Sequence, residues 1–370
     1  MQLVKTHRDN LLKPLQIVSG IVERRHTLPI LANLLIRKKG NEISFLSTDI
    51  EIQITTLADF GLGDEDVATT VSARKLVDVL RSLSDGEVAL SLDSKKLTVQ
   101  SGKSRFTLQT LAAEDFPVVT PLAEIRANIT ISQKQLKALL GMVSFAMAQQ
   151  DIRYYLNGML LTLEGQTLGA VATDGHRLSY CAQTVEVSGE IAGRHEVIVP
   201  RKTILELSRL LDDSDNPVKI EVGTNQIKFQ FAQVELISKL VEGKFPDYQR
   251  VVPKGYKNGF MVKREDLQHA LQRAAIMTSD KFKGVRWILA DNNLKIVSIN
   301  ADQEEANEEL ELDYQGEALD IGFNVVYLLD ILSNIKTENM QISLGDANSS
   351  ALFTLAENAE FKYVVMPMRI

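Results

Sequence analysis

The sequence predicts an α+β protein of three similar domains, each with two helices and antiparallel sheets. Three observations predict this class: a helical pattern that recurs three times, a second helical pattern upstream of each copy, and short alternating segments between them. The chain of 370 residues, 45% hydrophobic and 24% charged, is long enough for three domains.

The recurring pattern is an amphipathic helix whose apolar residues lie three or four positions apart. Its clearest copy is PRKTILELSRLL at residues 200–211, and the other two copies are residues 72–83 and 324–336. The first residues of successive copies are 128 and 124 residues apart. Such self-similarity at a domain-sized period indicates a repeated fold unit.

A second helix is expected roughly 60 residues upstream of each copy, over residues 7–19, 132–148 and 263–277. Ser132 is the clearest candidate for an N-cap. Pro14 lies within the first of these segments and is tolerable there only if it lies near the first turn of the helix.

Segments with period-two alternation lie between and after these helices and indicate antiparallel strands. They are residues 34–36, 42–46, 50–55, 87–92, 96–101, 105–111, 158–163, 167–172, 218–222, 226–231, 234–240, 285–290, 294–300, 308–314, 340–344, 350–355 and 362–366. Each unit therefore reads β-α-β-β-β-α-β-β-β. We expect domains at residues 1–125, 126–254 and 255–370, because Pro, Gly and Lys interrupt the pattern between them.

Charge is distributed unevenly between the helices and the rest of the chain. The six helical segments carry +8 in sum, whereas the whole chain carries −7, so the remaining residues carry −15. Mixed charge on solvated helix faces is the common alternative, but it explains this segregation poorly. A basic set of helices on an acidic body suggests a surface that attracts phosphates.

Geometry then indicates how many helices such a surface needs. Six helices spaced at roughly 10 Å in a circle leave a bore of only about 9 Å, whereas twelve leave about 28 Å. A DNA duplex, roughly 20 Å across, passes only through the second. We therefore expect one chain to line half of a head-to-tail homodimeric ring around double-stranded DNA.

Closing such a ring requires two complementary surfaces on each chain. The first unit offers basic and apolar residues, and the third offers acidic residues near apolar ones. The expected interface comprises Lys75, Lys103, Arg105, Phe106 and Leu108 on one side and Ile276, Met277, Glu304, Glu305 and Glu308 on the other. On the acidic run alone, a solvated loop is the more common interpretation.

Other classes of protein find little support. The single Cys181 excludes an intrachain disulfide, and the five histidines show no metal spacing, so we expect no metal and no cofactor. No apolar run is long enough to span a membrane and the first residues lack a signal peptide's apolar core, so we expect a cytoplasmic location. An enzyme would have to use Asp174 and His176, but no nucleophile motif or phosphate-binding loop accompanies them. An inert scaffold gives no reason for the segregated charge.

The whole chain resembles the β subunit family of bacterial DNA polymerase III, the replicative sliding clamps. The resemblance is carried by Thr27-Leu-Pro-Ile-Leu, Gln150-Asp-Ile-Arg-Tyr-Tyr-Leu-Asn-Gly, Thr173-Asp-Gly-His-Arg-Leu, Val199-Pro-Arg-Lys, Phe245-Pro-Asp-Tyr, Lys281-Phe-Lys-Gly-Val-Arg and Met366-Pro-Met-Arg-Ile. It implies a non-catalytic DNA sliding clamp, a processivity factor that tethers the polymerase III α subunit and is loaded by a clamp loader. Further implied partners are other polymerases, ligase and mismatch-repair proteins.

The resemblance also implies two sets of binding residues. A peptide-binding pocket would comprise Leu156, Thr173, Gly175, His176, Arg177, Leu178, Pro246, Arg250, Val251, Phe282, Asn324, Tyr327, Val364, Met366, Pro367, Met368 and Arg369. DNA would contact Arg25, Arg74, Gln150, Tyr154, Tyr155, Arg201 and Lys202. From the residues alone, core packing is the alternative for Val364 and Leu178, and half-buried strand positions are the alternative for Tyr154 and Tyr155.

Overall fold

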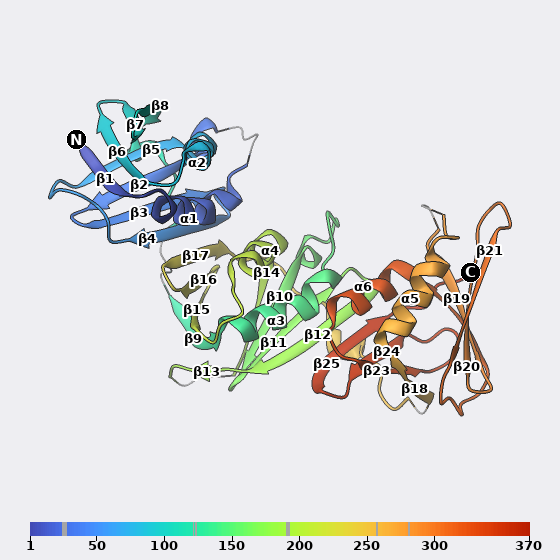
Figure 1. Cartoon of the computed structure of the whole chain (residues 1–370). Coiled ribbons are helices and arrows are strands. Elements are labelled where there is room, and N and C mark those ends of the chain that lie inside the picture. Colours follow the sequence, from blue (N-terminus) through green and yellow to red (C-terminus); the bar gives the residue numbers. More distant parts are fainter. Residues whose placement is uncertain (24–27, 121, 123, 190–192, 257, 280–281) are drawn as a thin grey trace. The chain divides into compact units, whose positions relative to one another are not determined.

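The computed structural model describes residues 1–23, 28–120, 122, 124–189, 193–256, 258–279 and 282–370. All six expected helices are present (Figure 1). They are α1 (Arg8–Val18), α2 (Ala73–Ser82), α3 (Gln133–Val143), α4 (Arg201–Leu210), α5 (Arg264–Ala275) and α6 (Val325–Asn334). Among the residues that the structure describes, every helix is too short or too polar to span a lipid bilayer.

The strands follow the same threefold repeat. The first repeat contains β1 (Gln2–His7), β2 (Asn33–Lys39), β3 (Glu42–Thr48), β4 (Ile52–Ala58), β5 (Val67–Ser72), β6 (Glu87–Asp93), β7 (Lys96–Ser101) and β8 (Ser104–Leu111). The second contains β9 (Ile125–Ser132), β10 (Gly158–Glu164), β11 (Thr167–Thr173), β12 (Arg177–Thr184), the short β13 (Glu186–Val187), β14 (Arg194–Pro200), β15 (Pro217–Gly223), β16 (Gln226–Phe231) and β17 (Val234–Lys239). The third contains β18 (Asn258–Lys263), β19 (Gly284–Ala290), β20 (Asn293–Ile299), β21 (Glu305–Glu311), β22 (Leu319–Asn324), β23 (Asn339–Leu344), β24 (Ala351–Leu355) and β25 (Asn358–Val365).

The first and third repeats have one strand more than the sequence predicts, and the second has two more, β14 and the short β13. The strands β5, β14 and β22 lead directly into α2, α4 and α6. They escape prediction because no turn separates strand from helix: the Ser72 hydroxyl and the Asn324 side chain cap the helices from the last position of their strands. The expected first-turn position of Pro14 is also wrong, because α1 already begins at Arg8 and encloses this proline.

The chain packs into two compact units. One comprises Met1–Lys134, Glu186–Ile191 and Leu205–Leu240, and the other comprises Gln135–Val185, Ala192–Ile204 and Val241–Ile370. The first contains a 13-stranded sheet in the order β1-β6-β7-β8-β5-β2-β3-β4-β17-β16-β15-β9-β13. The second contains an eight-stranded sheet, β14-β10-β11-β12-β25-β24-β23-β18, and a four-stranded sheet, β21-β20-β19-β22.

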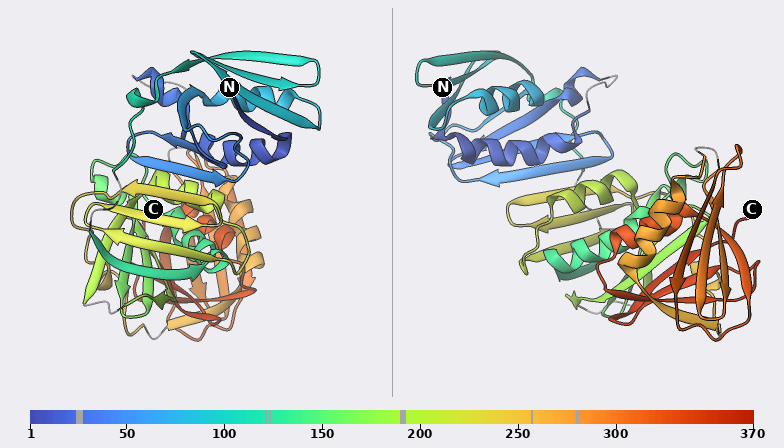
Figure 2. Two further views of the ribbon diagram at one scale, coloured as in Figure 1. Left: turned by 90° about the vertical axis from the view of Figure 1, so that its left-hand side faces the viewer. Right: turned by 45° about the vertical axis from the view of Figure 1, so that its right-hand side comes forward.

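Helix pairs cover these sheets and build the core. In the first unit α1 and α2 contact each other and bury Leu11, Leu15, Leu76 and Leu80 completely. In the second, α5 and α6 contact each other and lie against β18, β20, β21, β22 and β25 (Figure 2). The apolar spacing that predicts the helices therefore also identifies their buried faces.

Sheets run continuously from one repeat into the next. In repeat one, β4 is the third strand after the first helix. It pairs antiparallel with β17, the last strand of repeat two, at Leu236↔Ile54. In the same way β12 of repeat two pairs with β25, the last strand of repeat three, at Leu178↔Val364. The junction is thus a rule of the fold, in which the third strand of one repeat joins the final strand of the following repeat.

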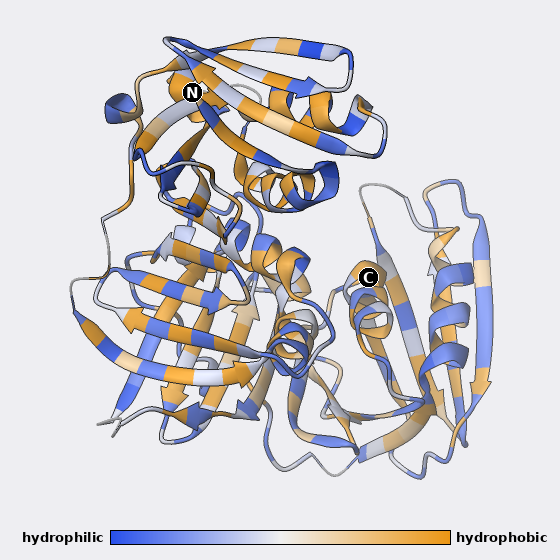
Figure 3. Cartoon of the chain, turned by 60° about the vertical axis from the view of Figure 1, so that its left-hand side comes forward, coloured by the Kyte–Doolittle hydropathy of each residue, from blue (hydrophilic) through white to orange (hydrophobic). Residues whose placement is uncertain are grey.

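Two strands that this rule would join have open edges. The strand β21 ends the four-stranded sheet, and β8 uses its second edge only at Thr110 and Leu111. The acidic run at residues 304–309 therefore lies mainly in an edge strand rather than in the solvated loop that is the more common interpretation of such a run. The strand β21 is hydrophilic over most of its length (Figure 3).

Candidate functional site

A hairpin turn between β11 and β12 forms one wall of a small cavity in the second unit. The Asp174 carboxylate accepts hydrogen bonds from the backbone N–H groups of His176 (2.9 Å) and Arg177 (3.0 Å). The Thr173 hydroxyl donates to the Arg177 carbonyl (2.6 Å) and accepts from the Gly175 N–H. Gly175 has φ of +90°, which only glycine adopts without strain. The Thr-Asp-Gly-His-Arg motif thus specifies a rigid turn.

Arg177 holds this turn against the rest of the unit. Its side chain is 9% exposed and donates to the carboxylates of Asp174 (3.1 Å) and Asp330 (2.5 Å). It also donates to the Phe145 carbonyl (2.9 Å) and lies 4.6 Å from the centre of the Tyr327 ring. Burial alone would lower the pKa of Arg177, but the Tyr363 phenol and Asp330 raise it well above its ordinary value. Arg177 therefore braces the wall, since each of its guanidinium nitrogens already has a partner in the chain.

Arg153 completes the wall beside the turn. Its guanidinium donates to both oxygens of Asp151 (3.0 and 2.9 Å) and to the Asp174 carbonyl (3.3 Å). The side-chain and backbone hydrogen bonds from Arg153 lower the pKa of Asp151 to about 2. Arg153 is 46% exposed, so it remains accessible to a ligand while its orientation is fixed.

The floor of the cavity is apolar and continuous with the core. Leu156, Leu178 and Val364 are at most 2% exposed and belong to one cluster that also includes Phe245 and Tyr248. The cavity has a volume of about 180 Å³ and is lined by Arg153, Leu156, Thr173, Gly175, His176, Arg177, Leu178, Pro246, Tyr248, Val251, Val364 and Met366. An apolar cavity rimmed by a few fixed polar groups suits an apolar side chain of a peptide.

The end of the chain lies beside this cavity. The Met366 N–H donates to the His176 carbonyl (2.9 Å), and the Met368 N–H donates to the Gly322 carbonyl (2.8 Å). A Cβ atom at Gly322 would collide with the Met368 carbonyl and the Ile370 side chain, so glycine permits the close approach. Met366 is 42% exposed and offers an adaptable apolar surface at the rim.

The structure brings most of the expected pocket residues around this one cavity. Seven expected residues do not line it: Arg250, Phe282, Asn324, Tyr327, Pro367, Met368 and Arg369. Tyr327 supports it from behind, because its ring stacks on His176 at 6.3 Å and contacts Arg177. Asn324 caps α6, Arg250 is paired with Asp247, and Phe282 is 38% exposed.

Two residues that line the cavity, Arg153 and Tyr248, are not predicted from the sequence. Arg153 is not among the expected pocket residues, and it reaches the cavity because residues 151–153 form a loop directly after Gln150, whose φ is +58°. Tyr248 stands in the Phe-Pro-Asp-Tyr motif but was not assigned to the pocket. It stacks on Tyr180 at 5.7 Å, and its hydroxyl accepts a hydrogen bond from Arg194.

The residues expected to contact DNA in the second unit lie in one connected block. Asn157 accepts from the Asp151 N–H (2.9 Å) and donates to the Asp151 carbonyl (2.8 Å), which closes the loop that contains Tyr154. The Arg201 N–H at the start of α4 donates to the Asn157 carbonyl (3.0 Å). Tyr154 is 57% exposed and lies in a 3-10 turn, so the alternative of a strand position does not hold. Gln150 and Lys202 are exposed, and Tyr155 is half-buried.

The other expected DNA contacts lie in the first unit or outside the described residues. Arg74 is exposed on α2 and lies 3.5 Å from Asp78. Arg25 lies outside the described residues.

The residues expected at the dimer interface are divided between the two units. Lys103 and Arg105 are exposed, and Phe106 and Leu108 are half-buried on β8. Ile276 is 73% exposed just after α5 and Met277 is half-buried. Glu304 and Glu305 are exposed where β21 begins. Glu308 accepts hydrogen bonds from Nε (2.8 Å) and Nη2 (2.6 Å) of Arg273, which lower its pKa. Lys75 is exposed on α2.

One cluster of potential metal ligands occurs among the described residues. His7, Asp9 and Asp85 place their ligand atoms within 4.8 Å of one another. The Arg8 guanidinium lies 2.9 Å from Asp9 and 3.5 Å from Asp85 and already compensates both carboxylates. The cluster therefore forms an ion-pair network between α1 and the segment before β6.

Comparison with known proteins agrees over the whole chain. Residues 1–120, 130–247 and 249–369 match the models of the N-terminal, central and C-terminal domains of the DNA polymerase III beta subunit. The beta sliding clamps of Pseudomonas putida and Escherichia coli are 48% and 44% identical to this chain, each over 98% of both chains. A crystal structure of the Pseudomonas aeruginosa DNA polymerase sliding clamp with ligand superposes with a TM-score of 0.96 at 46% identity, over all of both chains. The chain therefore belongs to the family of the DNA polymerase III beta subunit, the beta sliding clamps.

Proposed function

We propose that this protein is a non-catalytic processivity factor, which encircles duplex DNA as a head-to-tail homodimer and tethers the replicative polymerase. The family and its polymerase association support this function directly. The observation that carries the ring is the pairing rule of the sheets, in which β4 joins β17 and β12 joins β25. The remaining pair under the same rule is β21 with β8, and both have open edges. A second copy supplies the missing partner for each.

Charge and apolar area on the two edges support the same pairing. Lys103 and Arg105 beside the start of β8 are opposite in charge to the acidic run at residues 304–309. Phe106 and Leu108 on one side, with Ile276 on the other, supply the apolar centre that stable interfaces bury. Glu308 contributes less to the attraction because Arg273 already compensates its charge.

The DNA contacts that we propose are Arg25, Arg74, Gln150, Tyr154, Tyr155, Arg201 and Lys202. Arginine and lysine bind phosphate, and the exposed Tyr154 ring can stack on a base or sugar. Because enclosure retains the ring, these contacts can be few and weak, which suits a chain with a net charge of −7.

The cavity beside Met366 is proposed to bind peptide segments of partner proteins. Its apolar floor and the accessible Arg153 suit a short motif with an apolar anchor. The proposed occupants are segments of the polymerase III α subunit, the clamp loader, other polymerases, ligase and mismatch-repair proteins. The seven expected residues outside the cavity, from Arg250 to Arg369, would extend the binding surface.

We also propose domains at residues 1–125, 126–254 and 255–370, because the three repeats change near these positions. A cytoplasmic location is proposed because the relatives are bacterial sliding clamps, and because a chain with the single Cys181 forms no intrachain disulfide and suits a reducing compartment.

Retention on circular DNA tests the proposed function. The protein is assembled on nicked plasmid with the clamp loader of a related bacterium and ATP, and the complex is isolated by gel filtration. A ring stays on the circle at moderate salt and is lost when a restriction enzyme linearises the DNA. Equal retention on circular and linear DNA would reject enclosure.

A further inference from the structure

The three repeats differ in the course of the chain after their third strand. In the first, Val4 of β1 bridges Gly61, and the Leu62 N–H donates to the Leu3 carbonyl (2.9 Å). In the second, β13 pairs with β9 at Glu186↔Thr130 and Val187↔Ile129. In both, the chain that leaves the third strand covers the outer edge of the first strand of the repeat.

The third repeat begins the same way but does not complete the pairing. The Leu312 N–H donates to the Asn292 carbonyl (2.8 Å), as Gly61 does to Asn41 and Val185 to Gln166 in the other repeats. The Asn292 side chain then accepts the Tyr314 N–H (3.1 Å). This second bond holds the segment at the β19–β20 turn. Within the described part of the chain, no segment pairs with the outer edge of β18, which ends its sheet.

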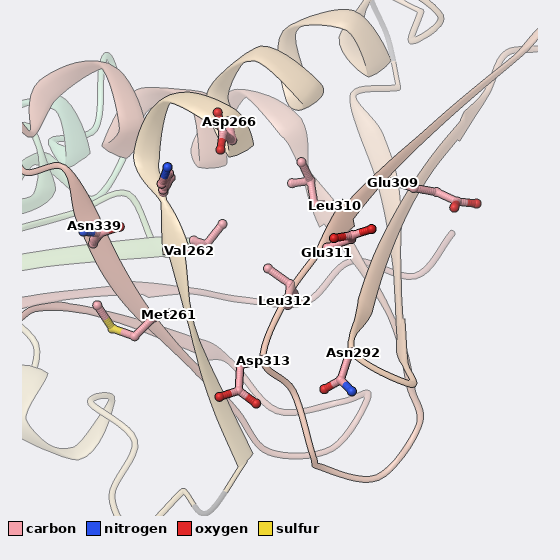
Figure 4. A pocket seen from close by; sticks show the side chains of 11 residues that line it. Met261, Val262, Asp266, Asn292, Glu309, Leu310, Glu311, Leu312, Asp313 and Asn339 are labelled. Carbon is pink, nitrogen blue, oxygen red and sulfur yellow. The ribbon is translucent and has the colours of Figure 1, made fainter.

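A cleft of about 700 Å³ lies where that pairing would be. Met261, Val262 and Lys263 of β18 form one wall, and residues 309–313 form the other (Figure 4). Val262 and Leu312, which are 5% and 8% exposed, face the cleft from opposite walls. Met261 is 46% exposed at its rim. The cleft therefore combines an open strand edge with apolar side chains.

The side chains along the second wall alternate in kind. Glu309, Glu311 and Asp313 are exposed, while Leu310 is half-buried and Leu312 is buried between them. Asp266 adds a fourth carboxylate against the single ammonium group of Lys263. Because side chains of a strand alternate between faces, a complementary strand would alternate basic and apolar residues.

We propose that this cleft binds an extended peptide segment of a partner protein, which adds as a strand to β18 and alternates lysine or arginine with apolar residues. Main-chain hydrogen bonds to the open edge supply affinity, and the alternating wall supplies selectivity. A strand of six residues, the length of β18, spans about 20 Å, which sets the size of the segment.

This cleft is separate from both surfaces of the proposed function. In the first repeat β17 pairs with residues 52–56 of the third strand, and the matching hairpin registers place residues 304–308 at the corresponding positions of β21. The cleft begins at Glu309, beyond that segment. It shares no lining residue with the cavity beside Met366.

Fluorescence anisotropy with a labelled octapeptide tests the proposal on the full-length dimer. The probe alternates lysine with valine, and it is compared with a glutamate version and with a version N-methylated at alternate backbone amides. We expect only the unmethylated lysine peptide to bind. The double variant Glu311→Lys/Asp313→Lys should weaken binding at least tenfold. The matched variant Asp64→Lys/Asp66→Lys, with the same charge change on an exposed loop, should leave it unchanged.

Four outcomes would overturn the proposal. Absence of binding means that the charges only protect the edge from aggregation. Equal binding of the N-methylated peptide means simple ionic attraction without strand addition. Equal loss in both double variants means that the peptide responds to net charge. Dissociation of the dimer by the peptide, measured by sedimentation, means that the cleft belongs to the surface between two copies.

Discussion

Arg177 and Asp330 lie 153 residues apart in the chain, yet their Nη1 and Oδ2 atoms are 2.5 Å apart. The pair joins the hairpin wall of the cavity to α6, and Arg177 is almost buried. Asp330→Asn should therefore lower the free energy of unfolding by about 1–2 kcal/mol, at the lower end of values for a lost charged partner because Asp330 is partly solvated. Urea denaturation measures this, with Glu338→Gln as an exposed control. An unchanged midpoint would show that the pair does not brace the wall.

Gly175 fixes the turn above the cavity. With φ of +90° and an ideal Cβ only 3.0 Å from Arg153 Nη2, Gly175→Ala should cost about 1–3 kcal/mol and displace Arg153. We expect affinity for a labelled polymerase-derived peptide to fall about tenfold while the protein remains a dimer. Full affinity in this variant would show that the turn geometry is not required for binding.

The low pKa of Asp151 predicts how the contribution of this carboxylate to stability depends on pH. Because the folded-state pKa of about 2 lies below the ordinary 3.8, the carboxylate's contribution is complete above the ordinary value and is lost as pH falls toward 2. Carboxyl-detected NMR should therefore show Asp151 titrating near 2, and Arg153→Ala should return it toward 3.8. A wild-type titration at the ordinary value would contradict the Asp151–Arg153 pairing.

Gly322 lets the end of the chain approach β22. In Gly322→Ala the new methyl group collides with the Met368 carbonyl and Ile370, so residues 366–370 should detach and peptide affinity should fall about tenfold. Hydrogen exchange of the Met368 amide measures the detachment. Gly141→Ala in α3 is the control, because its Cβ meets no atom within 4 Å and should change neither property. Retained protection of the Met368 amide would contradict this prediction.

The sequence predicts local structure better than it predicts contacts between distant segments. Apolar spacing located all six helices, because a helix that buries one face has apolar residues three or four positions apart, and this spacing can be recognised within a short segment. It missed β5, β14 and β22, since a strand that continues into a helix cap leaves no turn signal. The threefold repeat emerged from comparing segments rather than from any single one.

The roles of the site residues depend on contacts between segments that are distant in the sequence, so they were harder to predict than the helices. The resemblance supplied the pocket residues, and the structure brings most of them around one cavity. The roles within it were not predictable: Arg177 finds Phe145, Asp330 and Tyr363 on three separate elements, which no local pattern reveals. Arg153 was missed because a left-handed Gln150 turns a strand-like stretch into a loop.

Sedimentation of two charge variants, alone and mixed, tests the central claim that β8 of one copy pairs with β21 of the next. One variant carries Lys103→Glu/Arg105→Glu and the other carries Glu304→Lys/Glu305→Lys. Each alone should sediment largely as a monomer of 41.2 kDa, whereas their equimolar mixture should form a dimer of twice that mass, since one interface is native and the other has exchanged charges. Wild-type protein that is monomeric at micromolar concentration, or a mixture no more dimeric than its components, would contradict the account.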